Sequence, residues 1–186
     1  MSHHTNIKIM NRLIIAGFFL EAAFGIIGAA LPQNSFFQIF FWELGAMSLI
    51  ASSTLMAVKL ARQNWDIPAA GYTSLAIAQG VFYSVLSNEN TIEGNMDSFA
   101  LGSGVILLLP SMLLIFYYKV YPLWLRILGV VICVPFLILM YQVYDGEHVN
   151  LTSILNAVSF SLLQITSLCW GVVILRSMRS DEANKN

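Results

Sequence analysis

Long apolar runs alternate with short polar segments along the whole chain. Six of these runs are each roughly 20 residues long, which at 1.5 Å rise per helical residue is enough to cross the ~30 Å hydrocarbon core of a bilayer. The runs are too long for strands and do not alternate between polar and apolar positions, so they predict helices and not transmembrane strands. They cover residues 13–31, 36–58, 68–87, 99–118, 122–144 and 151–175.

The connections between the runs are short, and every second one is rich in turn-forming residues. Such segments favour tight reversals of the chain, so the runs group as three hairpins. The pattern predicts an all-α integral membrane protein with six transmembrane helices within residues 13–176. Residues 1–12 and 177–186 are predicted to be polar tails. The turn-rich segments are 32–35, 88–97 and 145–148.

Composition supports the same fold class. Of the 186 residues, 58% are hydrophobic and only 10% are charged, whereas an average soluble domain is ~45–50% apolar and ~25% charged. The predicted spans and connections leave no room for a soluble domain. The net charge of −1 shows no basic excess, so nucleic acid is not a predicted partner, and the lipid bilayer is.

The basic residues predict how the helices are oriented. The tails, the connections on their side and the start of the fifth helix hold every Lys and Arg. The opposite connections have no Lys or Arg, and two of them carry Asp and Glu. Short loops rich in Lys and Arg stay in the cytoplasm. Both chain ends are therefore predicted to be cytoplasmic, and a bacterial inner membrane is the favoured location. The basic residues are Lys8, Arg12, Lys59, Arg62, Lys119, Arg126, Arg176, Arg179 and Lys185.

Tyr and Trp residues cluster near the ends of the runs, where such side chains often anchor a helix at the membrane surface. Tyr141 and Tyr144 are predicted anchors on the outer side. The predicted cytoplasmic anchors are Trp65, Tyr117, Tyr118, Tyr121, Trp124 and Trp170.

Two acids, Glu21 and Glu43, lie inside the apolar runs. A charged carboxylate at the bilayer centre costs at least ~2.5–3.5 kcal/mol, and such residues usually face the bundle interior or a cavity. Glu21 shares one helical face with Gly17, Gly25 and Gly28. Because small residues let another helix approach closely, these glycines are predicted to be helix-packing residues and Glu21 is predicted to point inward.

Polar residues also share faces on two other predicted helices. Tyr72, Gln79 and Tyr83 lie on one face of the third, and Asn156 and Gln164 lie on one face of the sixth. If these faces point inward, they join the two acids in a polar centre. The candidate solute- or proton-binding residues are Glu21, Glu43, Gln79, Tyr72, Tyr83, Asn156 and Gln164.

The predicted polar centre favours a protein that binds or moves a small solute or ion, alone or together with a proton. Two nearby carboxylates at low dielectric cannot both be charged cheaply, so the pair suits a shared proton. The alternative is a non-catalytic membrane subunit or interaction protein that docks against a larger partner or a second copy. A lipid-modifying enzyme is the third option. No Cys/His cluster with metal spacing occurs, so no metal or other cofactor is predicted.

Overall fold

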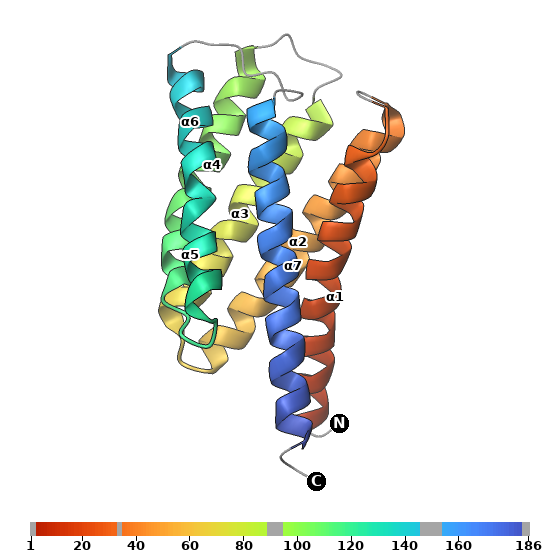
Figure 1. Cartoon of the computed structure of the whole chain (residues 1–186), viewed down its shortest axis with the longest axis vertical. Helices are drawn as coiled ribbons and strands as arrows, with labels where there is room; N and C mark the ends of the chain where they lie inside the picture. The colour runs from red at the N-terminus through yellow and green to blue at the C-terminus, as the bar shows by residue number, and fades with distance from the viewer. Residues whose placement is uncertain (1–2, 33–34, 89–94, 146–153, 184–186) are drawn as a thin grey trace.

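A computed structural model shows a bundle of antiparallel helices (Figure 1). In the residues that it describes every regular element is an α-helix, which confirms the predicted all-α class. The described residues are 3–32, 35–88, 95–145 and 154–183. The helices are α1 (His3–Ala29), α2 (Phe36–Arg62), α3 (Asp66–Asn88), α4 (Asn95–Phe116), α5 (Leu123–Val131), α6 (Cys133–Tyr144) and α7 (Ile154–Ala183).

Four stretches of the described chain are long and apolar enough to cross a membrane. They belong to α1, α2, the α5–α6 pair and α7. The apolar part of α4 described here is shorter, and α3 is more polar because of residues such as Tyr72 and Gln79. The four stretches are Ile7–Ala29, Phe36–Arg62, Leu123–Tyr144 and Ile154–Arg179.

The helix ends differ from the ends of the predicted runs. α1 begins at His3 and α7 continues to Ala183, so much of both predicted tails is helical. Hydropathy marks where a chain can meet lipid, whereas a helix continues as long as its backbone hydrogen bonds do. Polar residues such as Asn11 and Arg12 are compatible with a helix, and they extend α1 beyond its apolar part.

The helices form a closed ring in chain order. Each helix packs against the next, and α7 packs against α1, α5 and α6 to complete the ring. Both termini lie at the same end of the bundle (Figure 1). In the half away from the termini, α1 and α2 lean away from α7 (Figure 1).

Glycines set the closest approaches between neighbouring helices. A Cβ added at Gly17 of α1 would lie 2.7 Å from the Cβ of Ser52 on α2. A Cβ added at Gly71 of α3 would lie 2.9 Å from the backbone nitrogen of Ile115 on α4. At both contacts the two helices can therefore lie as close as they do only because the side chain is a hydrogen atom.

The predicted fifth span is two helices. It is interrupted at Ile132, between α5 and α6. Pro135 lies three residues further on and has no backbone N–H to donate to the carbonyl of Val131, four positions earlier. Its ring also clashes with that carbonyl in a regular helix. Pro110 leaves α4 unbroken, and Ser74 of α3 donates to the Leu107 carbonyl in the preceding turn at 3.1 Å.

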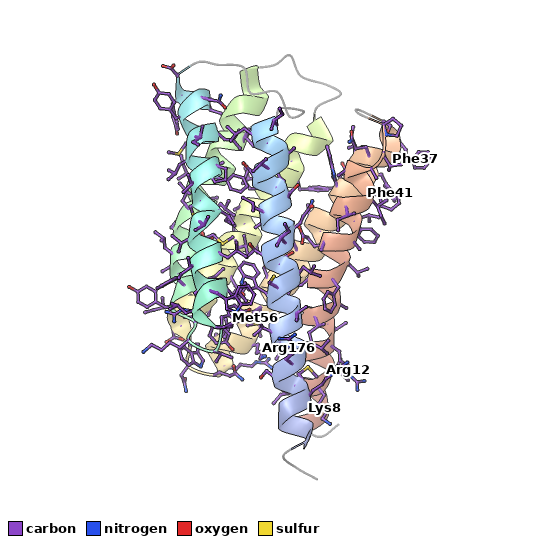
Figure 2. All side chains as sticks on the ribbon, in the orientation of Figure 1. Lys8, Arg12, Phe37, Phe41, Met56 and Arg176 are labelled. Atoms are coloured by element: carbon purple, nitrogen blue, oxygen red, sulfur yellow. The ribbon has the colours of Figure 1, made fainter. Side chains whose placement is uncertain are left out.

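Large apolar side chains are exposed on all seven helices. Examples are Phe36 at 76%, Ile154 at 84% and Leu123 at 60% exposure. A soluble monomer rarely exposes contiguous apolar surface of this extent, and such surfaces mark contact with lipid or partners. Figure 2 shows side chains all around the outside of the bundle, among them the exposed Phe37.

Three of the predicted surface anchors are buried, which corrects the prediction made from their position near helix ends. Tyr118, Tyr121 and Trp170 are only 5%, 2% and 1% exposed. They point into the interior of the helix bundle, which is filled there by aromatic side chains. Tyr117 and Trp124 are exposed near the same end, because depth along a helix does not determine which way a side chain points.

Arg126 joins the end of α4 to the start of α5. Its Nε donates to the Phe116 carbonyl, and its guanidinium lies 4.4 Å from the centre of the Phe116 ring. A charge-assisted hydrogen bond and a cation–π contact together are worth about 2 kcal/mol. We therefore expect Arg126→Ala to lower the unfolding free energy by about 1–2 kcal/mol, measured by thermal unfolding in detergent. Arg179→Ala, an exposed control on α7, should have no effect, and equal losses in both variants would contradict this role.

Candidate functional site

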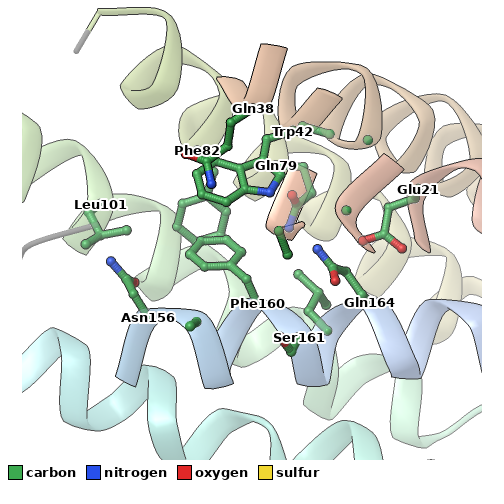
Figure 3. Close-up of a pocket in the computed structure, with 16 residues that line it drawn as sticks. Glu21, Gln38, Trp42, Gln79, Phe82, Leu101, Asn156, Phe160, Ser161 and Gln164 are labelled. Atoms are coloured by element: carbon green, nitrogen blue, oxygen red, sulfur yellow. The ribbon is translucent and has the colours of Figure 1, made fainter. Parts of the chain in front are cut away.

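A cavity of about 240 Å³ lies inside the half of the bundle away from the termini. Figure 3 shows the side chains that line it. It is surrounded by α1, α2, α3, α4 and α7. Ala29, Ala157 and Ser161 line it and are exposed, so the cavity reaches the bundle surface between α1 and α7. The lining residues are Glu21, Gly25, Ala29, Gln38, Trp42, Gly45, Ala46, Gln79, Phe82, Leu101, Asn156, Ala157, Phe160, Ser161, Leu163 and Gln164.

Glu21 is the only ionisable residue in the cavity lining that the structure describes. It is 6% exposed and lies in the second half of α1. Its carboxylate is hydrogen-bonded to the hydroxyl of Ser167 on α7. A buried carboxylate requires a compensating charge or a proton, and the lining offers no basic side chain.

The Ser167 hydroxyl stands between two acceptors. It contacts the Glu21 carboxylate, and it also lies 2.9 Å from the backbone carbonyl of Gln164. One hydroxyl carries one hydrogen and can donate to only one of them at a time. When Glu21 is ionised, Ser167 donates to it. When Glu21 is protonated, it donates to Ser167 and Ser167 donates to Gln164, so both states of the carboxyl keep a partner.

Four amide side chains, from α2, α3 and α7, share the cavity with Glu21. Gln38 donates to the Gly28 carbonyl at 3.3 Å. Gln79 is 4% exposed, and its Nε2 has no hydrogen-bond partner among the described residues. An unsatisfied buried donor costs about 1–3 kcal/mol. Figure 3 shows Gln79, Gln164 and Glu21 directing their polar groups toward the same part of the cavity.

The remaining walls are aromatic and aliphatic. Phe82 of α3 and Phe160 of α7 pack edge to face with ring centres 5.4 Å apart. Trp42 of α2 fits against Gly28, where an added Cβ would lie 2.5 Å from the indole.

Gly25 of α1 likewise leaves space for a cavity side chain, that of Gln164. A Cβ added at Gly25 would lie 2.0 Å from the Nε2 atom of Gln164. Two of the glycines predicted to pack helices, Gly25 and Gly28, therefore accommodate cavity side chains, while Gly17 faces α2.

A cluster of buried aromatic rings lies on the terminal side of the cavity. Phe18, Tyr72 and Trp170 pack together, with the Tyr72 and Trp170 rings 5.3 Å apart. Tyr121 stacks on Trp170, and its hydroxyl lies 2.6 Å from that of Tyr72. Burial raises the pKa of the Tyr121 hydroxyl, so this hydrogen bond joins two neutral groups. We call Phe18, Tyr72, Tyr121 and Trp170 the aromatic floor.

The structure brings four of the seven candidate binding residues together and leaves three apart. Glu21, Gln79, Asn156 and Gln164 line the cavity. Tyr72 belongs to the aromatic floor, whereas Glu43 and Tyr83 are half-buried and do not line the cavity.

The orientation of α2 explains the position of Glu43. α2 presents Gln38, Trp42, Gly45 and Ala46 to the cavity, and the next residue after Trp42 points roughly 100° away from it on a helix of 3.6 residues per turn.

Sequence reasoning missed several lining residues, for which a signal was present. Gln38 and Trp42 are one helical turn apart, and Gly45 and Ala46 continue the same face with small residues. Ser167, the hydrogen-bond partner of Glu21, is not part of the lining, and it lies on the α7 face of Asn156 and Gln164 that the sequence predicts to point inward. No group of three or more His, Cys, Asp or Glu side chains in the described residues is placed to hold a metal ion.

A comparison of the chain with models of known families, with curated proteins and with solved structures finds no match.

Proposed function

We propose that the chain is an integral membrane protein with six spans and cytoplasmic ends. The apolar side chains exposed on every helix support insertion into lipid. α3 suits a span despite its polar residues, because Tyr72 and Gln79 are buried while Ile67 and Ile77 are exposed. An outward apolar face is what a membrane helix presents to lipid.

The positions of the basic residues support the proposed orientation. Lys8, Arg12 and Arg176 lie toward the end of the bundle that carries the termini (Figure 2). The other described basic residues lie where α2 and α4 end, where α5 begins and near the end of α7. Lys185 lies outside the described residues. An excess of Lys and Arg on one side places that side in the cytoplasm, and for a bacterial chain the membrane is the inner one.

Within this membrane protein, we propose that the cavity binds a small solute or ion and exchanges it for a proton at Glu21. The observation that carries the proposal is a buried carboxyl in a cavity without a basic partner. The hydrogen bonds of Ser167 accommodate both the charged and the protonated carboxyl. Glu21 can therefore hold a proton when the cavity is empty and release it when another positive charge replaces it.

The open space in the bundle favours transport over a purely structural role. A seam that only joins helices would be closely packed, whereas this centre contains a cavity with a buried amide donor that has no partner among the described residues. The aromatic floor separates the cavity from the cytoplasmic end. Release of a solute to that side therefore requires the floor to open, so the described conformation is closed toward the cytoplasm.

The test is a flux assay with purified protein in liposomes that contain a pH-sensitive dye. Gradients of small amines, amino acids, carboxylates and inorganic cations are imposed one at a time, with protein-free liposomes as the blank. We expect at least one class to drive a pH change that requires the protein and disappears in Glu21→Gln. If no gradient produces a pH change that depends on Glu21, the proposed exchange function is wrong.

A further inference from the structure

The chemistry of the cavity also points to the class of solute. We propose that the cavity binds a small organic ammonium ion with an apolar body, and that this ion competes with the proton for Glu21. This inference rests on the proposed exchange function and adds the identity of the solute class. It follows from the charge, the walls and the size of the cavity.

The charge of the lining selects a cation. Glu21 is its only ionisable side chain, and Lys, Arg and His are absent from the lining residues that the structure describes. An anionic solute would meet a carboxyl group with no positive partner to offset the repulsion. A cation supplies the charge that a buried carboxylate requires, so one carboxyl can hold either a proton or the solute.

The walls select an organic cation over a metal ion. Trp42, Phe82 and Phe160 present aromatic rings to the cavity, and such rings attract ammonium groups while shielding an apolar body from water. Calcium takes 6–8 oxygen ligands and magnesium needs near-ideal octahedral geometry. The lining has only one carboxyl, and its other polar groups are neutral amides and a hydroxyl, so it supplies less negative charge than sites for these divalent ions usually do.

The size limits the solute to a small molecule. A cavity of about 240 Å³ corresponds to roughly eight waters at the ~30 Å³ that each occupies in the liquid. That volume suits an ammonium group with a short or single-ring body. It is below the ~300–1,000 Å³ typical of sites for drug-sized ligands.

Gln79 and Gln164 can orient the ammonium group. Their amides point to the same part of the cavity as the Glu21 carboxyl (Figure 3). An amide carries both an acceptor oxygen and a donor nitrogen, so a half-turn of the Gln79 amide presents its oxygen to an N–H of the ligand. This amide is suited to turning because its Nε2 has no partner to lose among the described residues.

Benzylamine, which is protonated at neutral pH, is a suitable probe. Benzyl alcohol and benzoate are its neutral and anionic counterparts, and sodium ion is the inorganic one. We expect benzylamine to change the tryptophan fluorescence of the purified protein in lipid nanodiscs, and Trp42→Phe should remove that change. The affinity should fall at least tenfold in Glu21→Gln, and also fall in Gln79→Leu, which keeps the carboxyl. Asp145→Asn, an exposed acid on the same side of the bundle, should bind as the wild type does.

The possible outcomes separate the solute class from the exchange function. A Glu21-dependent response to benzyl alcohol, benzoate or sodium that equals the response to benzylamine would overturn the organic cation and leave the exchange function standing. The organic cation would also be overturned, and the exchange function kept, if benzylamine gave no Glu21-dependent response while a different solute gradient drove Glu21-dependent flux in liposomes. If neither binding nor flux depends on Glu21, both proposals are wrong.

Discussion

The Glu21→Gln variant should lose solute-driven proton flux by at least about tenfold, whereas Glu43→Gln should retain it within about twofold. Removing one partner of a buried charge pair costs about 2–5 kcal/mol, and each 1.4 kcal/mol is a factor of ten. Glutamine preserves the shape of the Glu21 side chain but can neither carry a negative charge nor release a proton. The measurement is the initial rate of pH change in liposomes that contain equal amounts of each folded variant.

This comparison decides whether proton flux requires Glu21 alone or both Glu21 and Glu43. Both residues lie within apolar stretches of neighbouring helices, and the substitution is the same at each position. Glu21 lines the cavity, whereas Glu43 is half-buried and lies outside it. Loss of flux in both variants would show that the two acids act as a pair, as their positions in the sequence predict. Unchanged flux in Glu21→Gln would remove the cavity from the mechanism altogether.

Much of the architecture could be predicted from the sequence because lipid requires long apolar helices. The inward position of Glu21 was also predictable, since the glycines on its face mark the side where other groups come close. The same reasoning also predicted that Glu43, on a stripe of small residues with Ala46 and Ser53, points inward beside Glu21, but Glu43 does not line the cavity. Only the packing of α2 against α1 and α3 determines that Gln38 and Trp42 face the cavity and Glu43 does not.

The aromatic floor could not be predicted from position along the helices. Tyr121 and Trp170 lie near the ends of apolar runs, where tyrosine and tryptophan commonly face the membrane surface. Their burial depends on contacts between segments far apart in the chain, such as the hydrogen bond between Tyr121 and Tyr72. Hydropathy describes each helix separately, so it gives the depth of a ring but not its partners.

Gly71→Ala should destabilise the protein, because α3 and α4 touch at this position. An added Cβ would lie 2.9 Å from the backbone nitrogen of Ile115, the Cβ of Leu114 and the carbonyl oxygen of Ser111. Two of these are backbone atoms, which cannot move aside without shifting the helix. Overpacking of this kind typically costs about 1–3 kcal/mol, and at roughly 2–4 °C per kcal/mol the loss is measurable by thermal unfolding in detergent.

Gly80→Ala is the matched control, on the same helix and with the same chemical change. An added Cβ at Gly80 meets nothing within 4 Å, so alanine there should keep or raise stability by up to about 1 kcal/mol through its higher helix propensity. The two variants should therefore move the midpoint in opposite directions or leave only Gly71→Ala impaired. Equal midpoints would mean that α3 and α4 do not approach at Gly71. The ring would then lack the contact that holds α3, and with it Gln79 and Phe82, against the rest of the cavity.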